Sequence, residues 1–273
     1  MTALNTPNDL RQLTLSVCQT ARQAARYIAE ERTRFSAERI ECKHAHDYVS
    51  YVDKQSEQLI VAALRQLLPC AGFITEEGTA AYADEQYCWV IDPLDGTTNF
   101  IHSFSPYCVS IALCQDSSIL SGVVCEVTTG HCYYAWKGGG AWCEDKPIHV
   151  GSHQIDNALL CLQLPYNSDA YRPVIQRLID TFYGRVASIR MIGSAAMALC
   201  YVAAGMLDGY AEKYIGQWDY MAGSLIVTEA GGQVTDYSGS ADYTHGNSVV
   251  ATNGLIHQDL LQPILAQQST SLT

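Results

Sequence analysis

Two carboxylates placed directly after an apolar run constrain this chain most strongly. The segment WVIDPLDGTTNF covers residues 89–100, and its strand-forming residues 89–91 are followed by Asp92 and Asp95. A carboxylate buried behind such a strand costs free energy unless a charge or hydrogen bonds compensate it. Pro93 lies between the two acids, removes a backbone donor and fixes the local backbone. The segment therefore predicts a buried strand that ends in a functional site.

The residues that follow favour an anion. Gly96 allows a close backbone approach, and Thr97 and Thr98 can begin a helix whose free N–H groups face a negative group. Carboxylates beside such N–H groups suit divalent cations on one side and a phosphate on the other. Hard oxygen ligands in this arrangement suit Mg²⁺, which keeps several waters and binds alongside a substrate phosphate.

Three further acids stand at the end of an expected strand or at the start of an expected helix. Glu76 and Glu77 end a short apolar strand in GFITEEG, and Asp219 in QWDYMAG stands at the expected start of a helix. A solvated turn residue is the simpler interpretation of any one of them. Their occurrence together with Asp92 and Asp95 favours a shared metal site.

Composition and charge exclude several classes of protein. The chain has 273 residues, of which 48% are hydrophobic and 16% charged, and this predicts an ordinary globular protein. Its net charge of -12 argues against nucleic-acid binding, which needs clustered Lys and Arg. We find no apolar run of membrane-spanning length and no signal peptide pattern. We therefore expect a cytoplasmic protein with no membrane or nucleic-acid partner.

The cysteines predict buried thiols. There are 11, scattered without a CxxC pair and mostly inside apolar runs, which is typical of small buried residues in a reducing compartment. A zinc site on the segment CKHAH, residues 42–46, would have the wrong ligand spacing and no second ligand pair nearby.

The pattern of apolar residues changes near residue 150. Before it we expect a mixed α+β domain (1–150) with most of the acids, and after it an α/β domain (151–273) with Glu212 and Asp219. Segment 32–46 is expected to be a loop or a strand pair, and Asp53 is expected to cap the second helix. In the first domain, we expect the first helix to begin after Thr6 and strands at 72–75, 87–91, 107–113, 119–127 and 131–136. In the second, we expect strands at 158–162, 187–192, 209–212 and 233–236 and helices at 171–182, 195–204 and 220–230.

At this point the motifs resemble a family. WVIDPLDGTTNFIH is similar to the metal signature of the inositol monophosphatases, within the lithium-sensitive, Mg²⁺-dependent sugar phosphatases. The resemblance continues in FITEEG (73–78), GSAAMALCYVAAG (193–205) and YAEKYIGQWDYMAGSLIVTEAGG (210–232). It implies a layered α-β-α-β-α sandwich of the type shared with fructose-1,6-bisphosphatase. It also implies a homodimer that hydrolyses inositol monophosphate or a similar polyol or sugar phosphate.

The resemblance further implies a set of metal ligands. Glu76, Asp92 and the carbonyl of Leu94 would hold one Mg²⁺, while Asp92, Asp95 and Asp219 would hold a second. A third, weaker ion would use Glu76. Two residues depart from the family pattern. Met221 stands where the family usually has alanine, and Lys43 is offset by one residue from the position of the family's lysine.

Catalytic and substrate-binding residues follow from the same resemblance. The hydroxyl of Thr97, polarised by Asp53, would position the attacking water, with Glu76 as a further partner. A further set of residues, which overlaps with those above, would bind the phosphate or contact ring hydroxyls of the substrate: Asp95, Gly96, Thr97, Gly193, Ser194, Ala195 and Glu212.

Several alternatives stay open. Haloacid-dehalogenase-type phosphatases also place an aspartate and D-G-T after a strand, but their pattern is D-x-D, one residue shorter than the present one. Adenosine bisphosphate phosphatases carry Lys-Glu in place of Thr98 and Asn99, and this favours a monoester substrate here. NADP⁺, histidinol phosphate and sugar bisphosphates remain alternative substrates. Glu212 could instead be a solvated acid beside Lys213, and the chain could be a regulatory binding protein that keeps the fold.

Overall fold

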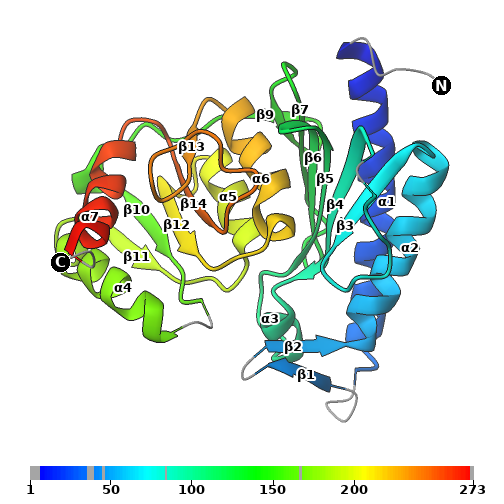
Figure 1. Cartoon of the computed structure of the whole chain (residues 1–273), viewed down its shortest axis with the longest axis horizontal. Helices are drawn as coiled ribbons and strands as arrows, with labels where there is room; N and C mark the ends of the chain where they lie inside the picture. Colours follow the sequence, from blue (N-terminus) through cyan, green and yellow to red (C-terminus); the bar gives the residue numbers. More distant parts are fainter. Residues whose placement is uncertain (1–6, 36–39, 45–46, 84, 166–167, 271–273) are drawn as a thin grey trace.

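The computed structural model describes residues 7–35, 40–44, 47–83, 85–165 and 168–270. Figure 1 shows its helices and strands. In chain order they are α1 (Pro7–Arg32), β1 (Ile40–His44), β2 (Asp47–Ser50), α2 (Tyr51–Leu67), β3 (Ala71–Thr75), β4 (Tyr87–Asp95), α3 (Thr97–Ile101), β5 (Cys108–Gln115), β6 (Ser118–Glu126), β7 (Cys132–Trp136), β8 (Ala141–Cys143), β9 (Lys146–Ile148), η2 (Ile155–Asn157), β10 (Leu159–Leu162), α4 (Ser168–Phe182), β11 (Ser188–Arg190), α5 (Ala195–Ala203), β12 (Gly209–Lys213), α6 (Gln217–Glu229), β13 (Gln233–Thr235), β14 (Ser248–Thr252) and α7 (His257–Thr270).

Helices and sheets form alternating layers, as Figure 1 shows. Helices α1 and α2 cover one face of a sheet with the strand order β3-β4-β5-β6-β7-β8-β9. Helices α5 and α6 lie between that sheet and a second one of order β11-β10-β12-β14-β13, whose far face is covered by α4 and α7. The expected layered α-β-α-β-α sandwich is confirmed.

The first sheet explains where the acids gather. Strands β3 and β4 run parallel, so their carboxyl ends meet at the same edge. The remaining strands from β5 to β9 continue as the expected antiparallel meander. Strand β4 is buried on both faces. Trp89 and Ile91 pack beneath α1 and α2, whereas Cys88 and Val90 pack toward α5 and α6.

Helix α6 lies directly on this sheet. A Cβ atom added at Gly122 of β6 would come within 2.5 Å of the carbonyl oxygen of Ala222, so only glycine permits this approach. Met221 stands where the family usually has alanine. It is 4% exposed and belongs to the same buried hydrophobic cluster as Ala222. That cluster contains residues of both sheets as well as α5 and α6. The boundary near residue 150 stays a prediction.

The structure corrects several boundaries. Helix α2 begins at Tyr51, so Asp53 lies in its first turn and does not precede it as a cap. Strand β4 continues past residue 91 to Asp95. The sequence analysis did not predict β8, β9, β14 or α7. Strands β8 and β9 are very short, and α7 contains Pro263, which is unusual inside a helix.

The segment expected to be a loop or strand pair forms the hairpin β1–β2. Residues 36–39 and 45–46, which include part of the CKHAH segment, lie outside the described residues, as does the side chain of Lys43. The ten cysteines with described side chains are free thiols, and most are buried. Within the described ranges, the helices are all too short or too polar for a membrane span.

Candidate active site

A β-bulge brings Asp92 and Asp95 to the same face of the sheet. Asp92 is paired with Ser110 of β5 and Asp95 with Cys108, so three steps along β4 match two along β5. In a regular strand, residues three apart point to opposite faces. The extra residue of the bulge turns the second side chain to the same face as the first. Both carboxylates therefore point toward the α5–α6 layer, and the D-P-L-D spacing is a bulged strand and not the turn expected from sequence.

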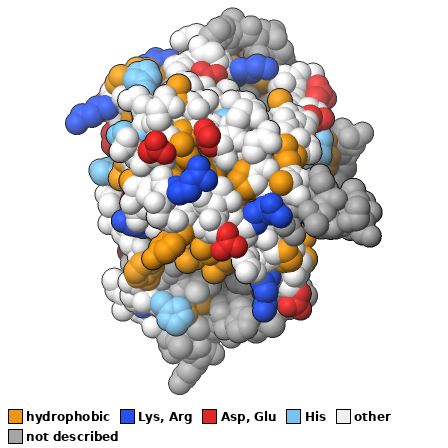
Figure 2. Space-filling model, turned by 90° about the vertical axis from the view of Figure 1, so that its left-hand side faces the viewer, with side chains coloured by type: hydrophobic (Ala, Val, Ile, Leu, Met, Phe, Trp, Pro, Cys, Tyr) orange, Lys and Arg blue, Asp and Glu red, His pale blue; other side chains and the backbone are white. Residues whose placement is uncertain are grey.

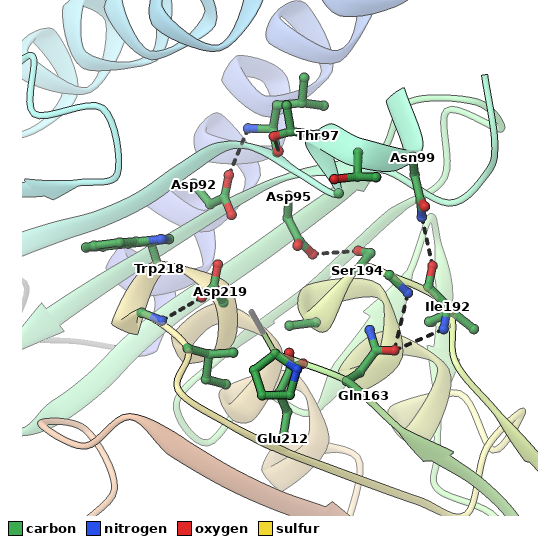
Figure 3. A pocket seen from close by; sticks show the side chains of 18 of the residues that line it. Asp92, Asp95, Thr97, Asn99, Gln163, Ile192, Ser194, Glu212, Trp218 and Asp219 are labelled. Atoms are coloured by element: carbon green, nitrogen blue, oxygen red, sulfur yellow. Dashed lines mark hydrogen bonds between the residues drawn. The ribbon is translucent and has the colours of Figure 1, made fainter. Parts of the chain in front are cut away.

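Asp219 completes a group of three acids (Figure 3). One carboxylate oxygen from each of Asp92, Asp95 and Asp219 lies within 4.8 Å of the others. Asp219 stands in the first turn of α6, where its Oδ2 accepts the backbone N–H of Gly216 at 2.6 Å. The N–H of Leu94 donates to Oδ1 of Asp92 at 2.9 Å. Asp92 and Asp219 are thus each held in place by a backbone donor close in the sequence.

Asp95 also fixes the start of α5. Its Oδ2 accepts a hydrogen bond of 2.5 Å from the hydroxyl of Ser194 and one of 2.8 Å from the N–H of Ala196. Ser194 is the N-cap of α5 and accepts the N–H of Met197. A carboxylate at a helix N-terminus is favoured by the free N–H groups and the helix dipole. The hydroxyl of Ser194 is therefore engaged with Asp95, and its substrate-binding role stays a prediction.

Glu76 lies beside this group without being part of it. Its backbone N–H donates to the carbonyl of Ile91 at 3.2 Å, which extends the parallel β3–β4 pairing by one residue. This places Glu76 next to Asp92. Its oxygens do not join the three that all lie within 4.8 Å of one another.

The acids strongly perturb one another. Burial, followed by the charges of Glu76, Asp95 and Asp219, raises the pKa of Asp92 well above its usual value. Burial and the charges of Asp95, Glu76 and Glu212 do the same to the pKa of Asp219. Burial raises the pKa of Asp95 despite its hydrogen bonds to Ser194 and Ala196. A bound divalent cation would remove this repulsion, and a set of carboxylates and a carbonyl suits Mg²⁺.

Thr97 and Asp53 are in contact. The Thr97 hydroxyl lies 3.0 Å from Oδ1 of Asp53 and 3.0 Å from the carbonyl of Leu94, and both are acceptors. Asp53 is 1% exposed, and its helix α2 packs against β4. The structure therefore brings together the two residues that sequence reasoning assigned to positioning water, although that role stays a prediction.

Two glycines permit a close contact between the segment before α3 and the segment before α5. Gly96, with φ of 89°, precedes α3, and a Cβ atom there would lie 3.2 Å from the carbonyl oxygen of Gly193. Asn99 supports the same contact, since its Nδ2 donates to the carbonyls of Ile192 at 2.7 Å and Pro106 at 2.8 Å. A Cβ atom at Gly193 would in turn lie 2.9 Å from Oδ1 of Asn99, so both glycines permit this close approach.

Glu212 is buried at the far end of the pocket. It is 8% exposed, and its Oε2 accepts the hydroxyl of Tyr210 at 2.6 Å. Burial and the charge of Asp95 raise the pKa of Glu212 to about 8, against the lowering effect of Tyr210. Lys213, which points to the other face of β12, lies over the ring of Tyr214. The alternative that Glu212 is a solvated acid is therefore wrong.

One pocket of about 530 Å³ is lined by Thr97 and by the acids described above other than Asp53. Its wall includes Gly193 and Ala195, which sequence reasoning assigned to the substrate, and an apolar rim of Phe104, Leu164 and Met191. Sequence reasoning missed Gln163, whose Oε1 accepts the N–H groups of Ile192 and Gly193. The sequence offered only a position: Gln163 directly follows the apolar run of residues 158–162.

The pocket is strongly acidic. Its described lining contains five carboxylates and no Lys, Arg or His side chain. The five are Glu76, Asp92, Asp95, Glu212 and Asp219. An anionic substrate cannot bind here unless cations neutralise these groups.

The acids make the stability of the metal-free protein depend on pH. The folded-state pKa of Asp92 is raised above its unfolded value of about 3.9, so the folded state holds more protons and stability falls as pH rises from about 4. Asp92→Asn keeps the oxygen that accepts the Leu94 N–H but removes one charge. We expect this variant, in EDTA, to be more stable than wild type at about pH 8, with a difference that shrinks toward about pH 4. Chemical unfolding across this range measures it, and parallel pH profiles would contradict the expectation.

Comparison with known proteins identifies the family of this chain. A model of the inositol monophosphatase family matches residues 9–271. An inositol-1-monophosphatase of Mesorhizobium japonicum is 35% identical, with 90% of this chain and 93% of that protein covered. The Nus factor SuhB of Pasteurella multocida is 36% identical, with 92% and 96% covered.

Solved structures show the same fold. The extragenic suppressor protein SuhB of Bartonella henselae superposes with a TM-score of 0.85 at 31% identity, with 91% of this chain and 96% of that chain covered. The IMPase of Thermotoga maritima gives a TM-score of 0.85 at 27% identity, with 95% and 99% covered. The family match over nearly the whole chain and the acidic pocket lead to one conclusion: this chain belongs to the inositol monophosphatase family, a family of phosphatases.

Proposed function

We propose that this chain is a Mg²⁺-dependent phosphomonoesterase that hydrolyses inositol monophosphate, or a similar polyol or sugar phosphate, by attack of water. The observation that carries the proposal is the pocket lining, which has five carboxylates and no cationic side chain among the described residues. A dianionic phosphate can enter such a pocket only together with metal cations. The relatives named inositol-1-monophosphatase support the substrate class.

The residues divide into two ligand sets. Glu76, Asp92 and the Leu94 carbonyl would hold one Mg²⁺, and Asp92, Asp95 and Asp219 would hold a second, with a third ion near Glu76. Bound Mg²⁺ would supply charge neutralisation and a water of lowered pKa. Oδ2 of Asp95 is occupied by α5, so its other oxygen is the one left for a metal.

Thr97 is suited to orient the attacking water. A hydroxyl has one hydrogen to donate and two lone pairs that accept. When its hydrogen is donated to Asp53 or to the Leu94 carbonyl, its lone pairs can accept a hydrogen bond from the water. Asp53 thereby fixes the direction of the hydroxyl, and no covalent phosphoenzyme is needed. The N–H groups of Gly96 and Thr97 would bind phosphate oxygens.

A regulatory binding role is the second candidate. Several relatives, among them the one from Pasteurella multocida, are named Nus factors, and this supports a protein partner for the present chain. The retained set of carboxylates favours catalysis, since a scaffold would not need it. The resemblance also supports a homodimer, which light scattering of the purified protein would test.

Phosphate release from a panel of phosphomonoesters tests the proposed function. The panel holds inositol monophosphates, an adenosine bisphosphate, NADP⁺, a sugar bisphosphate and an aryl phosphate, each with Mg²⁺ and with EDTA. We expect release only with Mg²⁺, and Asp92→Asn and Asp95→Asn should each lower kcat by ~10²–10³-fold or more while circular dichroism is unchanged. Substantial activity in EDTA would refute the mechanism, and no activity on any substrate would favour the regulatory role.

The Thr97–Asp53 pair gives a second prediction. Thr97→Ala should lower kcat far more than it raises KM, because the hydroxyl acts on the water and not on the substrate. Asp53→Asn should cause much of the same loss. Residues that act as one unit give losses that do not add, so the double variant should be little worse than Thr97→Ala. Steady-state kinetics of the three variants measure this, and fully additive losses would break the proposed pair.

Glu212 gives a third prediction. A buried acid that pairs with substrate hydroxyls contributes ~10²–10⁴ to discrimination between substrates. Glu212→Gln should lower kcat/KM for inositol monophosphates and leave an aryl phosphate without such hydroxyls nearly unchanged. Because the pKa of Glu212 is raised to about 8, the amide resembles the protonated acid below this pH. The effect should therefore grow as the pH rises through about 8. Equal, small effects on both substrates at every pH would remove Glu212 from substrate recognition.

A further inference from the structure

Helix α2 carries a buried polar stripe toward the active site. Asp53, Ser56 and Glu57 are spaced three and four residues apart and so lie on one face of the helix. Their exposed fractions are 1%, 0% and 0%. The next turns of α2 bury apolar residues, among them Ile60 and Leu64. Two buried carboxylates on an otherwise apolar face cost stability unless each is well hydrogen-bonded.

Each residue of the stripe contacts a different segment of the site. Asp53 accepts the Thr97 hydroxyl, and Ser56 donates to the carbonyl of Pro93 at 3.1 Å, between the two aspartates of β4. Glu57 uses both of its carboxylate oxygens. They accept the backbone N–H groups of Glu77 and Thr79, each at 2.8 Å.

The contacts of Glu57 fix the loop that follows β3. Hydrogen bonds from N–H groups to an ionised carboxylate are shorter and about twice as strong as neutral ones. The two donors are two residues apart, and the first of them, Glu77, immediately follows Glu76. Glu76 lies beside the acid group, and its own N–H donates to the carbonyl of Ile91. The hydrogen bond from the Glu77 N–H to Glu57 holds the backbone directly after Glu76, and this limits the directions that the Glu76 side chain can take.

We propose that Glu57 is a positioning residue for the metal site: its carboxylate holds loop 76–79 so that Glu76 stays beside Asp92. This inference rests on the proposed function, in which Glu76 is a metal ligand. Glu57 itself touches neither metal nor substrate. It acts on Glu76 through the backbone of Glu77 and Thr79.

Glu57→Gln tests the inference. The amide keeps the volume of the side chain, but its one oxygen can accept one N–H while its NH₂ group faces the other. Loss of such a supporting contact typically costs ~10–100-fold in metal affinity. We expect calorimetry to show Mg²⁺ binding weakened by about this factor, and kinetics to show a lower kcat that higher Mg²⁺ restores, with KM for the substrate little changed.

Glu229 offers a matched control. Its carboxylate accepts the N–H groups of Gly138 and Gly140 at 2.7 and 2.9 Å, which is the same two-donor pattern in a loop that does not line the pocket. Glu229→Gln should lower the thermal midpoint and leave the Mg²⁺ affinity unchanged. If Glu57→Gln behaves in the same way, Glu57 is structural only and the inference is overturned.

Two further measurements keep the test decisive. If Glu57→Gln does not fold, Glu57→Asp keeps the charge but is one methylene too short to reach both donors. Wild-type Mg²⁺ affinity in a folded Glu57→Asp protein would overturn the inference. Calorimetry needs no substrate, so a wild type that binds Mg²⁺ but releases no phosphate would refute the proposed function and leave the test of Glu57 intact. A wild type that binds no Mg²⁺ would refute both.

Discussion

The repulsion among three carboxylates, two of them buried and one half-buried, is the constraint on which the active site depends. Asp92, Asp95 and Asp219 meet within 4.8 Å at the boundary between the first sheet and the central helices. Burial raises the pKa values of all three, and the charges of neighbouring acids raise those of Asp92 and Asp219 further, so without a cation the ionised form is destabilised at this point. The bulge in β4 and the first turn of α6 create this arrangement. The carboxylates of the site repel one another, and a bound divalent cation would remove this repulsion.

The acids are kept in place by backbone donors and not by cationic side chains. Asp95 accepts from the start of α5, and Asp219 accepts from the residue before α6. Both helices lie between the two sheets, so their N-termini connect the edge of the sheet that carries the acids to the core around α5 and α6. Neutral donors have a specific advantage here. They orient each carboxylate without cancelling its charge, which stays available to attract a cation.

Sequence reasoning identified the acids but not their support. The segment 89–100 predicted a buried strand and a metal site, and the parallel ends of β3 and β4 place Glu76 as expected beside Asp92. Glu57 and Gln163 were not identified, because their partners are backbone N–H groups of residues distant in the sequence. A backbone donor has no side-chain identity, so no residue type marks it.

The sequence by itself determined which groups are present and how local segments fold. The spacing of apolar residues specified most strands and helices, and the D-P-L-D and W-D motifs specified the carboxylates. The tertiary structure decided their directions. Residues three apart in a regular strand face opposite ways, and only the pairing of β4 with β5, which skips one residue, turns Asp95 to the side of Asp92. Likewise, Glu212 became a buried acid with a raised pKa because packing removed its water, a property that depends on neighbours and not on the residue itself.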